Sequence, residues 1–291
     1  MKLTISHLIF TSALILASYD GKTREHRPLQ PEKKKVAPIG HIVYGNGTQN
    51  VIVLHDWMGD SENWLPLLPY LSLKNFTYTF MDVRGYGKSK DIKGSYKSEE
   101  IAQDIFDLAD YLGYNEFHLI GHSMTGMAVQ KAASLDRDNR IVSVIAITPV
   151  SAKGFPLDDK NKQFFKSIIN NRLVAEMGYN AMTGQRLTEN WQKERAQRFL
   201  ENVDPVACER YLEMWSNEDF SKQIAGLEKP FLVIAGQYDH PGFKLEAQKV
   251  NFESFKNVTF LENLNAGHYP MEETPIFLAT AIEDFLNKHI H

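Results

Sequence analysis

Between residues 50 and 265, short apolar runs alternate with longer segments of helical periodicity, and this alternation constrains the fold more than any other feature. Six runs are rich in apolar or β-branched residues, and most of them are typical of buried strands. They are "NVIVLHDW" (50–57), "FTYTFMDVRG" (76–85), "EFHLIGHS" (116–123), "IVSVIAITPV" (141–150), "PFLVIAGQYD" (230–239) and "NVTFLENLN" (257–265). Strands that alternate with helices in this way form a mainly parallel sheet with helices on both faces. The sequence therefore predicts an α/β fold.

Two helical segments carry clear start and stop signals. "SEEIAQDIFDLADYLG" begins with Ser98 as an expected cap, has acidic residues in its first turn and stops at Gly113. The final segment "TPIFLATAIEDFLNKHI" has Thr274 as an expected cap, Pro275 at the first helical position and a basic last turn. Both segments are predicted helices of the α/β fold.

Residues 151–225 interrupt the alternation. The segment is long, charged and helical in pattern, and it contains no convincing strand. An insertion of this length between two buried strands predicts a helical cap subdomain over the carboxyl edge of the sheet, where ligands bind in open α/β folds. Peripheral decoration is the alternative. The predicted core then consists of residues 36–150 and 226–291.

The first 35 residues differ from the rest of the chain. Lys2 precedes an apolar stretch that ends near residue 17, and a polar, highly charged stretch follows. This order predicts a secretory signal peptide over residues 1–18 and a polar tether over 19–35, and hence an exported protein, periplasmic or secreted. The apolar run is too short and too interrupted for a stable membrane span. A retained membrane anchor, or an ordinary helix of a cytoplasmic protein, is the alternative.

Composition excludes several classes of partner. With 291 residues, 43% of them hydrophobic, the chain can bury a sizeable core. The net charge of −4 offers no electrostatic reason to expect nucleic acid. Cys208 is the only cysteine, which excludes an intramolecular disulfide and a zinc site built on cysteines. The sequence leaves the oligomeric state open.

The stretch "LIGHSMTGMAVQ" (119–130) places Ser123 between a predicted strand and a predicted helix. Ser123 could cap the helix by accepting a hydrogen bond from a backbone N–H. It could instead be a nucleophile, held above the sheet by a strand, a tight turn and a helix. A nucleophilic serine needs a base to take its proton, and the base needs a third group to orient it.

Suitable partners follow two later strands. Asp239 comes just after the strand at 231–235, and His268 lies in the turn after the last strand. Serine, acid and histidine in this order match the chain order of α/β-hydrolases. The alternative acid position, after 141–150, offers no carboxylate before Asp158. We therefore predict Ser123, Asp239 and His268 as a catalytic triad.

Acyl transfer also needs hydrogen-bond donors for the oxyanion that develops on the carbonyl. The backbone N–H of Met124, which directly follows the serine, is one expected donor. The other is the N–H of Trp57, because the chain turns sharply after the strand that ends in "VIVLHDWMGD". His55 is expected to stabilise that loop, and His122 to have a structural role.

From residue 40 to 290 the chain resembles the α/β-hydrolase-fold enzymes that carry a helical cap. The matching motifs are "LHDWMGDSENW", "MDVRGYGKS", "GHSMTG", "GQYD" and "AGHYPMEETP". The resemblance implies that Ser123 is the nucleophile, Asp239 the acid, His268 the base, and Trp57 and Met124 the oxyanion donors. It implies hydrolysis of an ester or related acyl compound, with an apolar or aromatic substrate suggested by the aromatic residues of the cap. No metal and no organic cofactor are needed.

Two residues depart from the family pattern. Asp56 replaces the usual glycine of the oxyanion loop, and Thr125 replaces a glycine where strand and helix pack closely. Hydrolase-like small-molecule receptors of plants and their bacterial relatives also have a hydroxylated residue at the latter position. A slowly turning-over ligand-binding protein, and a cofactor-free dioxygenase or perhydrolase, are therefore the alternatives. A nucleotide-binding loop at Gly-Lys-Ser (87–89) is excluded, because the required glycine is Asp82.

Overall fold

The computed structural model describes residues 37–290. The predicted signal peptide and tether lie outside these residues. Within the described range, no helix is long and apolar enough to cross a membrane.

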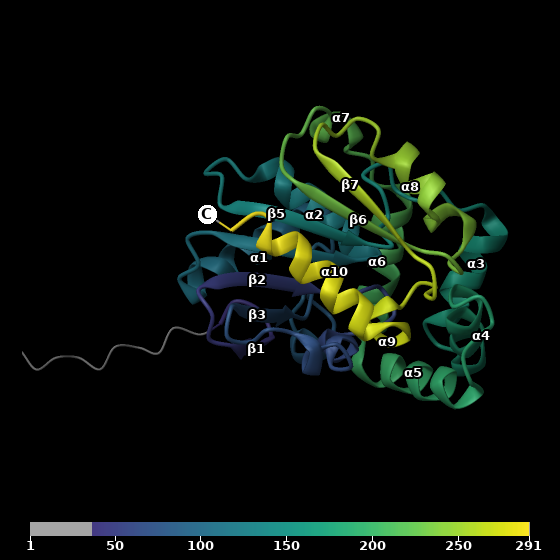
Figure 1. Cartoon of the computed structure of the whole chain (residues 1–291). Helices are drawn as coiled ribbons and strands as arrows, with labels where there is room; N and C mark the ends of the chain where they lie inside the picture. Colours follow the sequence, from purple (N-terminus) through teal and green to yellow (C-terminus); the bar gives the residue numbers. More distant parts are fainter. Residues whose placement is uncertain (1–36, 291) are drawn as a thin grey trace, which may run out of the picture. The chain divides into compact units, whose positions relative to one another are not determined.

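A seven-stranded sheet forms the centre of the described chain (Figure 1). Its strand order is β1-β3-β2-β4-β5-β6-β7; β1 pairs antiparallel with β3, and all other pairs are parallel. The strands are β1 (His41–Gly45), β2 (Gln49–Leu54), β3 (Phe76–Met81), β4 (Phe117–His122), β5 (Ile141–Ile147), β6 (Phe231–Gly236) and β7 (Val258–Asn263). All six predicted strands are confirmed. Strand β1 was not predicted, because this edge strand is half exposed and has no buried apolar run.

Ten α-helices and four short 3₁₀ helices surround the sheet in the described chain. Those of the core are α1 (Ser98–Leu112), α2 (Met124–Leu135), α8 (Leu245–Asn251), α9 (Pro270–Glu273) and α10 (Pro275–Asn287). The others lie between β5 and β6: α3 (Asp159–Ile168), α4 (Arg172–Met182), α5 (Glu189–Asn202), α6 (Pro205–Asn217) and α7 (Ser221–Ile224). The 3₁₀ helices are η1 (Ser61–Trp64), η2 (Leu68–Tyr70), η3 (Gly87–Ser89) and η4 (Pro241–Phe243).

The predicted helix boundaries are close to those observed, but neither expected capping side chain makes a cap hydrogen bond. Ser98 is the first residue of α1, and its hydroxyl donates to Glu218 Oε2 at 2.5 Å instead of capping the helix. Thr274 occupies the N-cap position of α10 without a side-chain cap bond, because its hydroxyl oxygen accepts from Asn263 Nδ2 at 2.6 Å. The last turn of α10 contains no basic residue. Tertiary partners thus replaced the local hydrogen bonds that the sequence suggested.

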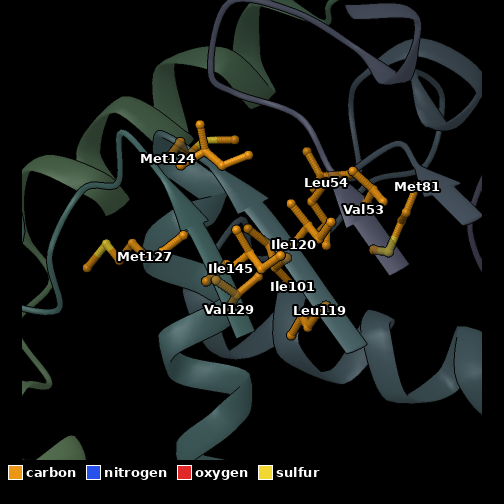
Figure 2. Packing of buried hydrophobic residues seen from close by; sticks show 14 of the residues in the cluster. Val53, Leu54, Met81, Ile101, Leu119, Ile120, Met124, Met127, Val129 and Ile145 are labelled. Carbon is orange, nitrogen blue, oxygen red and sulfur yellow. The ribbon is translucent and has the colours of Figure 1, made fainter. Parts of the chain in front are cut away.

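The core lies where the central strands pack against α1 and α2 (Figure 2). All six residues of β4 are buried, as parallel strands covered on both faces require. Val53, Leu54 and Ile120 are each at most 2% exposed, and Met127 and Val129 of α2 are fully buried. This packing holds the carboxyl end of β4 and the start of α2 rigidly in place.

Helices α3 to α7 form a helical insertion between β5 and β6, and Figure 1 shows α3, α4 and α5 together at one end of the sheet, with α7 apart from them. Hydrogen bonds join the insertion to the loops that follow β2 and β3. Trp57 Nε1 donates to Cys208 O at 2.9 Å, and Asp204 N donates to Gly85 O at 2.8 Å. The predicted fold class, a mainly parallel sheet with helices on its faces and an inserted helical segment, is confirmed.

Candidate active site

Ser123 lies at the turn between β4 and α2 with strained backbone angles, φ 54° and ψ −113°. Such a conformation costs a non-glycine residue about 1 to 3 kcal/mol and persists only where the surroundings impose it. Here the Ser123 N–H donates to Ile147 O at 2.9 Å, and its carbonyl oxygen accepts from Val150 N at 3.0 Å. Ser123 occupies the N-cap position of α2, but its hydroxyl makes no cap bond. The helix-cap interpretation of this serine is therefore wrong.

The close packing at this turn depends on glycines on either side of Thr125. A Cβ at Gly121 would lie 2.5 Å from Thr125 O, and one at Gly126 would lie 2.5 Å from Pro149 Cβ. Thr125 itself is fully buried and is accommodated by hydrogen bonds. Its hydroxyl accepts from His122 N at 3.0 Å and donates to His55 O at 2.8 Å. The departure from glycine thus ties the serine turn to the loop after β2.

Three side chains predicted as a triad lie in hydrogen-bond contact. His268 Nε2 is 2.8 Å from Ser123 Oγ, and His268 Nδ1 is 2.7 Å from Asp239 Oδ2. Because a carboxylate can only accept, the Nδ1 atom carries the proton and Nε2 is free to accept from the serine hydroxyl. Asp239 Oδ1 accepts from His240 N at 2.6 Å, which holds the carboxylate in place. All three side chains are at most 8% exposed.

Two other buried histidines near the serine, His55 and His122, have structural contacts. His55 Nε2 accepts from Val83 N at 3.1 Å while its Nδ1 donates to Asp56 O at 2.7 Å, so this ring fixes the loop after β2. His122 Nε2 donates to His268 O at 2.7 Å. Burial lowers the pKa of His122 to about 3, so its ring is neutral at pH 7. The structural roles expected for both residues agree with these contacts.

Trp57 and Met124, the two residues predicted to supply backbone donors, line the same cavity as Ser123. Met124 is the first residue of α2, where backbone N–H groups have no partner within the helix and the helix dipole favours negative charge. Trp57 lies in the loop after β2, and within residues 37–290 its N–H has no hydrogen-bond acceptor. Its ring is held by Trp215 and Phe165, at centroid distances of 5.8 and 5.7 Å.

Asp56, the second departure from the family pattern, is buried at the centre of a polar network. Its carboxylate accepts from Met58 N at 3.1 Å, Asn63 Nδ2 at 2.7 Å and the Tyr269 hydroxyl at 3.1 Å. Burial opposes the charged form, but neighbouring imidazoles and the Arg195 guanidinium outweigh it and lower the pKa of Asp56. Asp56 therefore connects the loop of Trp57 to the residue that follows His268. Tyr269 and Arg195 were not predicted, although Tyr269 directly follows the predicted base.

Ser123, His268 and Trp57 line a cavity of about 220 Å³ between the sheet edge and the helical insertion. Most of its wall is apolar or aromatic, and the side chains include Met58, Met124, Val150, Phe155, Leu157, Phe164, Phe165, Ile168, Met182 and Trp215. Asn161 and His240 are among its few polar groups. In the part of the chain that the structure describes, no cluster of three or more His, Cys, Asp or Glu side chains could hold a metal ion.

Comparison with known proteins places the chain in a family. The family model described as "alpha/beta hydrolase fold" matches residues 49–275, which is most of the chain. The chain belongs to the alpha/beta hydrolase fold family. The family resemblance inferred from the sequence motifs is thereby confirmed.

Curated relatives of this alpha/beta hydrolase are distant. An acetyltransferase component of the acetoin cleaving system of Cupriavidus necator is 30% identical over 36% of this chain, which spans only 28% of that protein. Pyrrolizixenacetamide deacetylase of Xenorhabdus hominickii is 23% identical over 86% of the chain and 95% of its own length. The pimeloyl-[acyl-carrier protein] methyl ester esterase of Legionella pneumophila is 23% identical over 81% and 94%.

Among solved structures, bromoperoxidase from Bacillus anthracis superimposes with a TM-score of 0.75 at 22% identity, covering 85% of this chain and 94% of that one. At this identity the likeness shows the fold alone. The family and the esterase-named relatives support a hydrolase.

Proposed function

We propose that this alpha/beta hydrolase cleaves carboxylic esters through a covalent acyl-enzyme, with Ser123 as nucleophile, His268 as base and Asp239 as the orienting acid. One observation carries the proposal: an unbroken series of hydrogen bonds runs from Asp239 through His268 to Ser123, whose hydroxyl faces an apolar cavity. A serine in this setting has both a base for its proton and space for a substrate carbonyl.

The proposed reaction has two halves. His268 Nε2 takes the hydroxyl proton as Ser123 Oγ bonds to the carbonyl carbon, and the resulting imidazolium gives that proton to the leaving alcohol as the ester C–O bond breaks. Water then enters, loses a proton to His268 and attacks the acyl-enzyme. The carboxylic acid leaves as Ser123 regains its proton. These steps need neither a metal nor an organic cofactor.

The amides of Trp57 and Met124 are the proposed oxyanion donors. Each such donor contributes about 3 to 4 kcal/mol to transition-state stabilisation in enzymes where one has been removed. The aspartate in place of glycine at position 56 removes no oxyanion donor, because the proposed donor is the backbone N–H of the next residue, Trp57. The Asp56 carboxylate is itself occupied by three hydrogen bonds. Its contacts hold the loop that presents the Trp57 amide.

We further propose that the substrate is a small molecule with an apolar or aromatic group. The cavity wall is supported by a cluster of Trp57, Phe165 and Trp215, whose rings contact edge to face. Removing apolar surface from water stabilises a bound chain by about 0.8 kcal/mol per methylene. The few polar groups of the wall offer little to a charged substrate. The helices of residues 151–225 then act as a cap over the site.

The first test is labelling with a fluorophosphonate probe, followed by turnover of p-nitrophenyl esters and the matching anilides. We expect the wild type to be labelled and to turn over esters many times, and Ser123→Ala and His268→Ala to lose both activities. Ser134→Ala and His41→Ala, which change the same residue types away from the cavity, serve as matched controls. An unlabelled wild-type protein would contradict the proposal.

The same measurements separate the alternatives. A fast burst of one product equivalent followed by negligible turnover indicates a ligand-binding protein that retains the triad. Faster turnover of anilides than of esters indicates an amidase, the class to which the name of the Xenorhabdus deacetylase points. Product formation that depends on oxygen or peroxide indicates a dioxygenase or perhydrolase.

Export remains a proposal based on residues 1–18 alone. Expression of the full chain followed by cell fractionation and N-terminal sequencing tests it. Processing near residue 18 with release from the cytoplasm is the expected result. An unprocessed N-terminus in the cytoplasmic or membrane fraction would contradict it.

A further inference from the structure

A second cavity of about 540 Å³ lies next to the catalytic cavity, and the two share Phe155 and Pro156 in their walls. We call this second space the outer groove. Apart from the shared residues, its apolar lining comes from Pro149 after β5 and from Ala247 and Val250 of α8. Val250 is 60% exposed, so the outer groove is open to solvent. The Phe155 segment therefore separates the catalytic cavity from an apolar groove on the surface.

The backbone of this separating segment is held firmly. Gly154 has φ 74° and donates to Ser151 O at 2.9 Å, and a Cβ there would lie 2.8 Å from Glu218 O. The next amide, Phe155 N, donates to Trp215 O of the helical insertion at 3.0 Å. None of these contacts uses the Phe155 side chain. Truncating that side chain therefore leaves the path of the backbone supported.

The Phe155 ring packs on the loop after Asp239. It stacks on Phe243 with a centroid distance of 5.1 Å and an interplanar angle of 7°, and it meets the His240 ring edge-on at 5.8 Å. Gly242 leaves room for it, since a Cβ there would lie 2.5 Å from Phe155 Cε2. These contacts give the ring one defined position between the two spaces.

The volumes show what this position implies for the substrate. Pockets for drug-sized ligands typically measure roughly 300 to 1,000 Å³. The catalytic cavity, at about 220 Å³, is smaller than this range, whereas the two spaces combined would fall within it. A substrate alkyl chain that is too long for the catalytic cavity and extends toward Phe155 contacts the Phe155 ring. The outer groove, on the other side of this ring, is the next apolar surface.

We propose that the Phe155 ring is a specificity-determining residue that limits the length of the apolar part of the substrate. In the wild type the ring closes the catalytic cavity, so short-chain esters are preferred. Without the ring, the outer groove continues the cavity and receives the far end of a longer chain. This inference depends on the proposed ester hydrolysis by the same site.

The test compares the wild type with Phe155→Ala on two series, p-nitrophenyl alkanoates and alkyl acetates, each from two to sixteen carbons. We expect the chain length with the highest kcat/KM to increase in Phe155→Ala in one of the two series. Each additional buried methylene corresponds to about a fourfold gain in binding. Three further methylenes would raise the ratio of kcat/KM for long over short esters on the order of 50-fold. Phe155→Leu, which keeps an apolar side chain, should give a smaller increase.

Two further variants distinguish a connection between the catalytic cavity and the outer groove from a simple loss of side-chain volume in the cavity wall. Phe164→Ala removes the same side chain from a wall that only the catalytic cavity has, so it should not give the long-chain gain. Adding Val250→Asp to Phe155→Ala places a charge in the outer groove, and should cancel the gain while the short-ester kcat/KM stays at the value of the single variant.

The outcomes separate this inference from the proposed function. If the wild type hydrolyses no ester, the proposed function fails. If Phe155→Ala hydrolyses short esters but its chain-length profile matches the wild type in both series, the role of Phe155 is refuted while the proposed function stands. A gain that Phe164→Ala reproduces, or that survives Val250→Asp, also refutes it. A thermal melt of each variant shows whether a lost activity reflects unfolding.

Discussion

Replacement of Thr125 by valine tests whether the hydroxyl at the serine turn stabilises the fold. Thr125→Val keeps the side-chain shape and volume almost unchanged. It removes the acceptor of the His122 N–H and the donor to the His55 carbonyl, which lie 3.0 and 2.8 Å from the hydroxyl oxygen. Both backbone groups belong to buried residues, so water does not readily replace the lost partner.

The expected loss of stability follows from these two groups. One buried polar group left without a partner costs about 1 to 3 kcal/mol, so the two groups together cost about 2 to 6 kcal/mol. Thr125→Ser is the matched control, since it keeps the hydroxyl and removes one methyl group, at a cost of about 1 kcal/mol. Thr125→Val should therefore be the less stable variant, although its side chain is the closer match in volume.

The measurement is urea unfolding of the wild type and both variants, with the slope of the transition checked for constancy. The free energy of unfolding should fall in the order wild type, Thr125→Ser, Thr125→Val. Ester turnover should fall more in Thr125→Val than in Thr125→Ser, because the hydroxyl joins the loop of Trp57 to the turn of Ser123. If Thr125→Val is at least as stable as Thr125→Ser, the reasoning about the hydroxyl is refuted.

Three further substitutions test the surroundings of the site. Asp239→Asn should lower kcat on the order of 10⁴-fold with little change in KM, because the amide no longer holds His268 in the required tautomer; steady-state kinetics measure this, and an unchanged kcat contradicts it. Burial lowers the pKa of His122 from 6.5 to about 3, so between these pH values the unfolded chain binds a proton that the folded chain excludes. This contribution lowers the free energy of unfolding as the pH drops from 6.5 to about 3, by up to about 1.4 kcal/mol per pH unit. Urea titrations at several pH values should show a smaller loss over this window for His122→Asn than for the wild type. Tyr269→Phe removes the hydrogen bond to the Asp56 carboxylate and should cost about 1.5 to 3 kcal/mol of stability; equal unfolding midpoints for this variant and the wild type would show that the bond contributes nothing.

The order of strands and helices, and the places where strands end, could be predicted from the sequence because these signals are local. Apolar runs, turn residues and a glycine such as Gly113 act within a few residues of one another. The ends of parallel strands meet at one edge of a sheet, so Ser123, Asp239 and His268 could be placed together from their positions after three strands. The edge strand β1 was missed because its exposed residues carry no apolar run.

Tertiary structure decided what local patterns do not encode. The hydroxyls of Ser98 and Thr274 form hydrogen bonds with side chains of other segments instead of capping their helices. The Thr125 hydroxyl is accommodated by hydrogen bonds to the backbone, one of them to His55 in the loop after β2. Tyr269 reaches Asp56 across 213 residues of sequence. Such contacts depend on side-chain rotamers and on the packing of segments far apart in the chain. For the same reason, only the structure shows that Phe155 lines both the cavity at Ser123 and the outer groove.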